Sequence, residues 1–138
     1  ILVDLYTDWC GWCKVMDKQT FANKQVATYI NENFYAVKFN AEQRNAVQLE
    51  GEQFDFLMRG GKGVHELALR LTNNQLSYPT VVFIDERLQV IQPVPRFMKA
   101  KDFHEVITYF GGDLYKKIPF EEYKSATYPQ KSSKEVVK

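Results

Sequence analysis

The stretch Val3-Asp4-Leu5-Tyr6-Thr7-Asp8-Trp9-Cys10-Gly11-Trp12-Cys13-Lys14 determines how the rest of the chain is interpreted. It begins as a short apolar strand, turns sharply, and places two cysteines where a helix should begin. A helix from Gly11 would put Cys10 at its N-cap, beside unpaired backbone N–H groups and the positive end of the helix dipole. Both features stabilise a thiolate, the nucleophilic form of cysteine. The spacing also brings Cys13 one turn below Cys10, close enough to close a small disulfide ring.

Length and composition exclude several classes of protein. The chain has 138 residues, one domain by length, and its 45% hydrophobic and 25% charged residues are typical of a globular protein. The formal net charge is +1 and no basic stripe occurs, so nucleic acid is not an expected partner. No apolar run approaches the roughly 18 residues that a membrane helix needs. Both cysteines of the chain lie in the motif, which excludes a structural disulfide framework.

A cysteine pair can also be buried as apolar side chains or form half of a zinc site. Zinc needs four ligands, and the remaining candidates are His65 and His104, which are not spaced as paired ligands. We therefore expect redox chemistry and no metal. Both histidines are expected at the surface or at an interface, on helices.

Five features in this order resemble the thioredoxin superfamily. A tryptophan precedes the first cysteine in that family, as Trp9 does, and a lysine commonly follows the second, as Lys14 does. An acid lies six residues before the first cysteine, as Asp4 does. A lysine in the next central strand is matched by Lys38, and a cis-proline loop by Tyr78-Pro79-Thr80. The layout is also similar to bacterial thioredoxin-related proteins and to the C-terminal domain of bacterial thiol:disulfide interchange proteins.

The element pattern predicts a thioredoxin-like α/β three-layer sandwich. Relative to a full thioredoxin, the strand-helix unit that would precede Ile1 is not in this sequence, and we expect either a trimmed mature fragment or a fold that lacks this unit. An export signal could have been removed. We expect one domain over residues 1–128 and a disordered tail over residues 129–138. Strands are predicted at 1–6, 34–40, 80–84 and 88–92, and helices at 10–19, from an Asn23 N-cap to about 30, and at 103–110, with a last helical piece near 119–125.

Residues 41–77 are predicted to be an insertion into this fold. Apolar and polar residues alternate on both sides of Glu50-Gly51-Glu52, which indicates a β-hairpin. The segment Arg59-Gly60-Gly61-Lys62-Gly63 is rich in glycine but lacks the Gly-Lys-Ser/Thr ending of a phosphate-binding loop, so we interpret it as a turn. A helix over Val64 to Leu71 should follow.

The resemblance implies roles for the central residues. Cys10 would be the exposed attacking nucleophile and Cys13 the resolving thiol buried behind it. Asp4, an acid on an apolar strand, would help to move the proton of Cys13, with Lys38 beside it. Alternatively, Asp4 points to solvent at a strand end and Lys38 is an ordinary surface lysine.

Substrate contacts are expected around the disulfide. A cis peptide bond before Pro79 would place the backbone of Tyr78 beside the cysteines, where a peptide can pair with it. Trp9 and Trp12 would be exposed aromatic contacts, with Gly11 between them. Thioredoxins have a glycine near the position of Val94-Pro95, and its absence here alters the expected docking surface.

The function implied is a protein thiol:disulfide oxidoreductase that uses a Cys10–Cys13 disulfide and no other cofactor. A reductase is favoured over an oxidant, although Gly11-Trp12 contains neither the proline of reducing thioredoxins nor the histidine of oxidising isomerases. The alternative is a peptide-binding or chaperone-like module in which redox activity is incidental. Expected partners are disulfide-bearing or thiol-bearing proteins and an electron donor or acceptor protein. We expect a monomer, exported to the periplasm or, alternatively, cytoplasmic.

Overall fold

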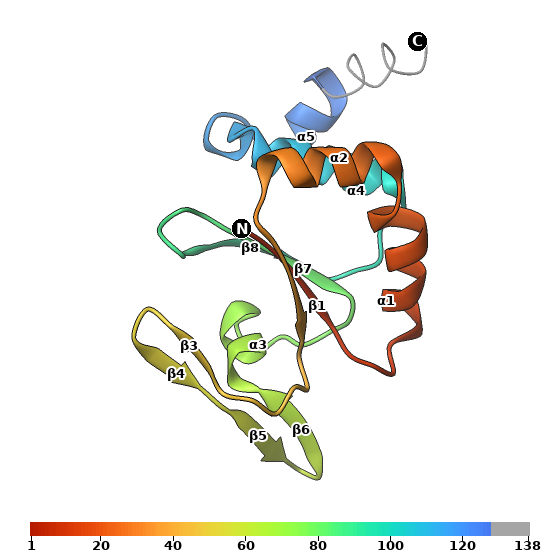
Figure 1. Ribbon diagram of the computed structural model, residues 1–138. Coiled ribbons are helices and arrows are strands. Elements are labelled where there is room, and N and C mark those ends of the chain that lie inside the picture. Colours follow the sequence, from red (N-terminus) through yellow and green to blue (C-terminus); the bar gives the residue numbers. More distant parts are fainter. Residues whose placement is uncertain (128–138) are drawn as a thin grey trace.

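The computed structural model describes residues 1–127 and contains a central four-stranded sheet (Figure 1). The strand order is β2-β1-β7-β8, in which β1 (Leu2–Tyr6) and β7 (Thr80–Ile84) are interior and β2 (Ala36–Asn40) and β8 (Val90–Val94) are edges. Strand β1 pairs in parallel with β2 and antiparallel with β7, and β7 pairs antiparallel with β8. The predicted tail, residues 129–138, lies outside the described residues.

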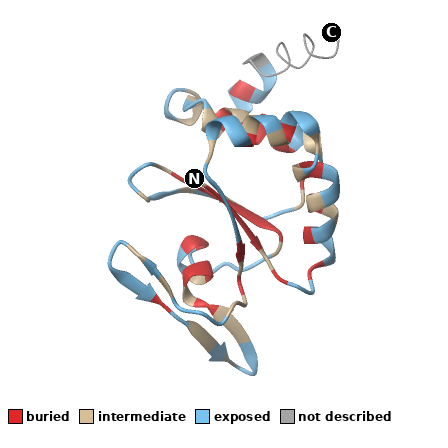
Figure 2. Cartoon of the chain, in the orientation of Figure 1, coloured by how far each residue is buried: buried red, intermediate tan, exposed pale blue. Residues whose placement is uncertain are grey.

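Helices cover both faces of the sheet, so the predicted α/β sandwich is confirmed (Figure 1). One face packs against α1 (Gly11–Met16), α2 (Lys24–Asn33) and α4 (Ala100–Gly111). The other face packs against α3 (Glu66–Leu71). Successive residues of a strand point to opposite faces, and the interior strands are buried on both, as Figure 2 shows.

Helix α1 continues into the π-helical segment η1 (Asp17–Phe21), which differs from the single helix predicted over residues 10–19. Helix α2 begins as predicted, because the Asn23 side chain accepts a hydrogen bond from the backbone N–H of Val26 at 3.1 Å. The chain after α4 forms the short helices η2 (Leu114–Lys116), α5 (Phe120–Glu122) and η3 (Tyr123–Thr127). The last helical piece predicted near residues 119–125 is confirmed, and it packs on the body of the protein through Tyr123, which is fully buried.

Two expectations about the edge strands were wrong. Strand β2, which carries Lys38, lies at the edge of the described sheet rather than in its centre. Strand β8 begins at Val90 and runs through Pro93 to Val94, whereas the predicted strand covered residues 88–92 and ended before this proline. An edge strand tolerates proline where the missing N–H would face solvent.

The insertion contains two hairpins instead of one. The predicted hairpin consists of β3 (Val47–Leu49) and β4 (Glu52–Phe54). A second hairpin consists of β5 (Phe56–Arg59) and β6 (Lys62–His65). Its turn is the predicted glycine-rich turn, with φ of 56° at Gly60 and 78° at Gly61, a backbone region that favours glycine.

His65 is not at the surface, which corrects the expectation for this histidine. Its side chain is fully buried, and it is the N-cap of α3. Nδ1 accepts a hydrogen bond from the backbone N–H of Leu67 at 3.1 Å, and Nε2 lies 2.9 Å from the carbonyl oxygen of Asn45. The predicted helix therefore starts at Glu66, with Val64 and His65 in a strand. His104 is half-buried on α4, where its ring contacts that of Tyr29.

Candidate redox site

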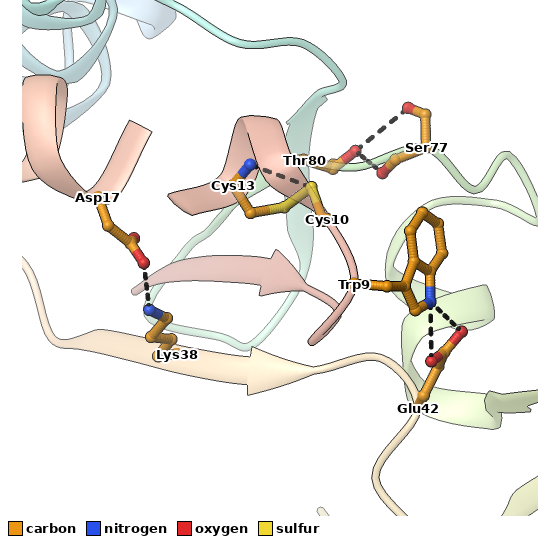
Figure 3. The surroundings of a disulfide bond; sticks show 8 residues. All are labelled: Trp9, Cys10, Cys13, Asp17, Lys38, Glu42, Ser77 and Thr80. Carbon is orange, nitrogen blue, oxygen red and sulfur yellow. Dashed lines mark hydrogen bonds and ion pairs between the residues drawn. A yellow bond between two sulfur atoms is a disulfide. The ribbon is translucent and has the colours of Figure 1, made fainter. Parts of the chain in front are cut away.

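Cys10 and Cys13 form a disulfide at the start of α1 (Figure 3). Cys10 is the N-cap residue, with an extended backbone, and its Sγ accepts a hydrogen bond from the backbone N–H of Cys13 at 3.0 Å. This is the N-cap position predicted from the sequence. When the disulfide is reduced, the same amide hydrogen bond and the helix dipole favour a negative charge on Cys10 Sγ.

Both cysteines are buried in the disulfide form. Their exposed fractions are 5% for Cys10 and 4% for Cys13, so the expectation of an exposed Cys10 is not met in this state. The physical reason is that Cys10 Sγ is bonded to Cys13 and turned to the first turn of the helix. The neighbouring indole side chains are exposed instead, with exposed fractions of 67% for Trp9 and 61% for Trp12.

Each indole is fixed by contacts that the sequence did not predict. Trp9 Nε1 donates to the carboxylate of Glu42, with distances of 3.0 and 3.1 Å to its two oxygens (Figure 3). The Trp9 ring also packs edge-on against Tyr78, with 5.8 Å between centroids. The Trp12 ring lies 5.1 Å from that of Phe97. An exposed tryptophan that is held in place can present a preformed apolar surface to a partner.

The loop beside the motif carries the proline singled out in the sequence. The Tyr78–Pro79 peptide bond is cis. The hydroxyl of Thr80, the first residue of β7, donates to the carbonyl oxygen of Ser77 at 2.6 Å and ties the two ends of this loop together (Figure 3). Through the contact between Tyr78 and Trp9, the loop lies directly against the motif.

Asp4 is buried in β1, with 8% of its surface exposed. Alternation along the strand puts it on the same face as Leu2, which packs in the core beneath α1, the helix that carries Cys13. The pKa of Asp4 is raised to about 6, mainly by burial and in addition by the nearby Asp17 carboxylate, while the Lys38 ammonium lowers it and so limits the rise. The carboxyl can therefore gain or lose a proton near neutral pH.

Lys38 lies directly opposite Asp4 in the β1–β2 register, but its ammonium is bound elsewhere. Lys38 Nζ donates to Asp17 Oδ2 at 2.6 Å (Figure 3). It also lies 4.8 Å from the centroid of the Tyr6 ring. The hydrogen bond to Asp17 raises the pKa of Lys38. Asp17 was not predicted as a site residue. The available signal was its position four residues after Cys13, one helical turn further along.

The described residues contain neither a metal-binding cluster nor a membrane-spanning helix. Within residues 1–127, no group of three or more His, Cys, Asp or Glu side chains is arranged to hold a metal ion. No helix in the same range is long and apolar enough to cross a membrane.

The sequence matches a known protein family over most of its length. Residues 1–108 match the family Thioredox_DsbH, described as a protein of unknown function, DUF255. The uncharacterized protein B0495.5 of Caenorhabditis elegans is 46% identical over 35 residues. That match covers 25% of this chain and only 5% of the curated relative's length.

Two solved structures share the fold. A thioredoxin-fold protein from Helicobacter pylori superposes with a TM-score of 0.63 and 21% identity, covering 88% of this chain and 74% of that one. A structure titled DsbH Oxidoreductase superposes with a TM-score of 0.52 and 17% identity, covering 78% of this chain and 68% of that one. At these identities the likeness establishes the fold and leaves the chemistry to be argued from the residues.

Proposed function

The chain belongs to the Thioredox_DsbH family, and from this premise we propose that it is a thiol:disulfide oxidoreductase that reduces disulfides in other proteins. The observation that carries the proposal is the Cys10–Cys13 disulfide at the N-terminus of α1, with Cys10 Sγ accepting the backbone N–H of Cys13. In this position, the helix stabilises the thiolate that Cys10 forms on reduction, and Cys13 lies one turn away to re-form the disulfide.

The reaction consists of two exchanges. In the reduced protein, the Cys10 thiolate attacks one sulfur of a substrate disulfide, forms a mixed disulfide and releases the other substrate sulfur as a thiolate. The Cys13 thiolate then attacks Cys10 Sγ, which breaks the mixed disulfide and releases the second substrate sulfur. Two electrons pass to the substrate, and the protein returns to its Cys10–Cys13 disulfide. A dithiol protein restores the reduced form by the reverse sequence.

Asp4 supplies the proton transfer that the second exchange needs. Cys13 must lose its proton before it can attack, and a buried thiol resists ionisation. Asp4 lies on the sheet face beneath the helix that carries Cys13, and its pKa of about 6 suits a group that accepts a proton near neutral pH. Lys38, held by Asp17, carries the positive charge that lowers the pKa of this carboxyl and so limits how far it rises.

The reducing direction rests on the resemblance of Trp9, Asp4, Lys14 and Lys38 to the reducing branch of the superfamily. Its partners would be disulfide-bearing proteins and a protein electron donor. The similarity to exported thiol:disulfide interchange proteins supports the periplasm, with the cytoplasm as the alternative, and a monomer suffices for this chemistry. Substrate would contact Trp9, Gly11, Trp12, Tyr78 and Pro79.

An insulin-reduction assay with dithiothreitol tests the activity. We expect the wild-type protein to accelerate reduction and Cys10→Ser to abolish the acceleration. Exchange that persists in Cys10→Ser would refute the proposal. If Cys10→Ser has no exchange but keeps full activity in the cell, the peptide-binding alternative holds, because redox chemistry would then be dispensable.

The equilibrium redox potential against glutathione tests the direction. A value near −270 mV, about that of thioredoxin, supports a reductase, and a value near −120 mV, about that of a strong oxidant, contradicts it. The difference is decisive because about 30 mV already changes the exchange equilibrium tenfold in a two-electron reaction.

A further inference from the structure

A groove connects the disulfide motif to the second hairpin of the insertion. We call it the hairpin groove. It has a volume of about 470 Å³, and its walls include Gly61 and Gly63 together with six larger side chains. These are Trp9, Glu42, Arg44, Phe56, Met58 and Lys62. Trp9 immediately precedes Cys10, so one wall of the groove is a residue of the disulfide motif.

The far wall of the hairpin groove is built around Phe56. A Cβ atom at position 63 would lie 2.1 Å from the Phe56 ring, so the ring occupies space that only glycine leaves free. The guanidinium of Arg44 lies over the same ring, 5.0 Å from its centroid. Gly63 therefore leaves room for the end of the Phe56 ring, and the cation–π contact holds the Arg44 side chain against the same ring.

The cations of the groove are available to a ligand. Arg44 and Lys62 are exposed, and neither forms an ion pair with any carboxylate in the described part of the chain. The one acid of the groove, Glu42, already accepts hydrogen bonds from Trp9 Nε1. Apolar surface lies beside the cations, since Met58 is 62% and Trp9 67% exposed.

We propose that the hairpin groove binds an acidic residue of the substrate, with an apolar neighbour, in the segment that carries the cysteine attacked by Cys10. This inference rests on the proposed function and names its substrate class. A guanidinium with free N–H groups binds a carboxylate with two parallel hydrogen bonds, which suits Arg44 to an aspartate or glutamate. The indole of Trp9 and the thioether of Met58 offer contacts to the apolar neighbour. Because Trp9 belongs to both sites, one extended segment can reach both.

Reduction of matched peptides tests the proposal. Each peptide contains a single cysteine, bonded to 2-mercaptoethanol through a disulfide, and carries a Phe with either Glu or Lys two to four residues from that cysteine on both sides. The prereduced protein converts the mixed disulfide to the peptide thiol and 2-mercaptoethanol, and itself becomes the Cys10–Cys13 disulfide. We expect kcat/KM to be about tenfold higher for the acidic peptide than for the basic one, as charge complementarity at one close ion pair permits.

Charge-reversal variants locate this preference. R44E/K62E should reverse it, mainly through KM, and the neutral pair R44Q/K62Q should abolish it. The matched control is R87E/K117E, which makes the same change in net charge at exposed positions of the β7–β8 turn and the η2 turn. The control should keep the wild-type preference and should reduce bis(2-hydroxyethyl) disulfide, a neutral substrate too small to reach the groove, at the wild-type rate.

Four outcomes would overturn the inference. They are equal rates for the two peptides with the wild-type protein, an unchanged preference in both groove variants, the same loss in R87E/K117E, or a groove variant that changes the sedimentation of the protein and so shows a second copy in the groove. Failure of the wild-type protein to reduce bis(2-hydroxyethyl) disulfide would instead refute the proposed function.

Discussion

The disulfide motif and the insertion are built in opposite ways. The motif leaves β1, an interior strand whose residues Leu2–Leu5 are buried, and enters a helix packed on the same sheet. The insertion consists of two separate two-stranded hairpins that are largely exposed, and it is anchored by Phe54, His65 and α3. A rigid, buried frame suits chemistry that depends on the distance between reacting atoms, whereas exposed hairpins suit contacts that select a partner.

In the disulfide motif, replacement of Cys13 should abolish turnover. Cys13→Ala removes the thiol that releases the substrate, so the first exchange still occurs but the second cannot. We expect turnover to stop and a mixed disulfide through Cys10 to accumulate. Non-reducing mass spectrometry of the protein with a disulfide substrate checks this. Continued turnover without a trapped adduct would show that Cys10 works without Cys13.

His65 should be the most costly single residue of the insertion. His65→Ala removes two buried hydrogen bonds and leaves a cavity beside Phe39, so we expect a loss of about 2–4 kcal/mol in the free energy of unfolding. Urea denaturation measures it, with Gln48→Ala on the exposed side of β3 as the control, expected to change stability by less than about 0.5 kcal/mol. Equal effects of the two substitutions would mean that His65 does not anchor the insertion.

The buried carboxyl of Asp4 should lower the free energy of unfolding when it is ionised. Its pKa is higher in the folded state than the ordinary value of 3.8, so the folded protein binds more protons than the unfolded chain between about pH 4 and 6. Stability therefore falls as the pH rises through this window, and the ionised carboxylate is fully destabilising above about pH 6. Asp4→Asn should raise stability by up to about 3 kcal/mol at pH 8, at about 1.4 kcal/mol per pKa unit.

The Asp4→Asn gain should vanish at pH 4, where both proteins carry a neutral group at this position. Thermal unfolding at a series of pH values from 4 to 8 checks the expectation. The same variant should slow the release step, because Asn cannot accept a proton. A gain in stability that does not depend on pH would show that the burial of the Asp4 charge is not its cause.

Asp17 should have the smallest effect on stability and a measurable effect on titration. Its ion pair with Lys38 is partly exposed, so Asp17→Asn should change the free energy of unfolding by less than about 1 kcal/mol. The pKa of Asp4 should fall, because a repelling carboxylate is removed and the Lys38 ammonium is freed to act on Asp4. NMR titration of the Asp4 carboxyl carbon checks this, with Glu32→Gln on the exposed surface of α2 as the control.

Local signals made the sheet and the motif predictable from the sequence. The N-caps Cys10 and Asn23 and the apolar strand Thr80–Ile84 depend on residues close in the chain, and each lies where the sequence placed it. The hairpin turn at Glu50-Gly51 was predictable for the same reason, since Gly51, which has a φ of 78°, lies between two alternating runs of apolar and polar residues.

The partners of the site depend on contacts between distant residues, and the sequence did not reveal them. Glu42 binds Trp9 across 33 positions, and Asp17 binds Lys38 across 21. In the sequence, His65 looks like any polar residue at the start of a helix. Its buried position depends on contacts with Asn45 and Phe39, which are distant in the chain. The second hairpin was missed because Phe56 and Leu57 fitted the alternation of the first one, and the glycine turn alone did not specify its strands.

One strand carries the acid, and the chain leads from its end to the nucleophile through only Thr7, Asp8 and Trp9. The distance between the carboxyl of Asp4, the proposed proton acceptor, and the sulfur of Cys10 is therefore limited by the covalent chain between them, and movement elsewhere in the molecule changes it little. Under the proposed function, substitutions in the hairpins would consequently change which substrates the protein binds and leave the thiol–disulfide exchange itself unchanged.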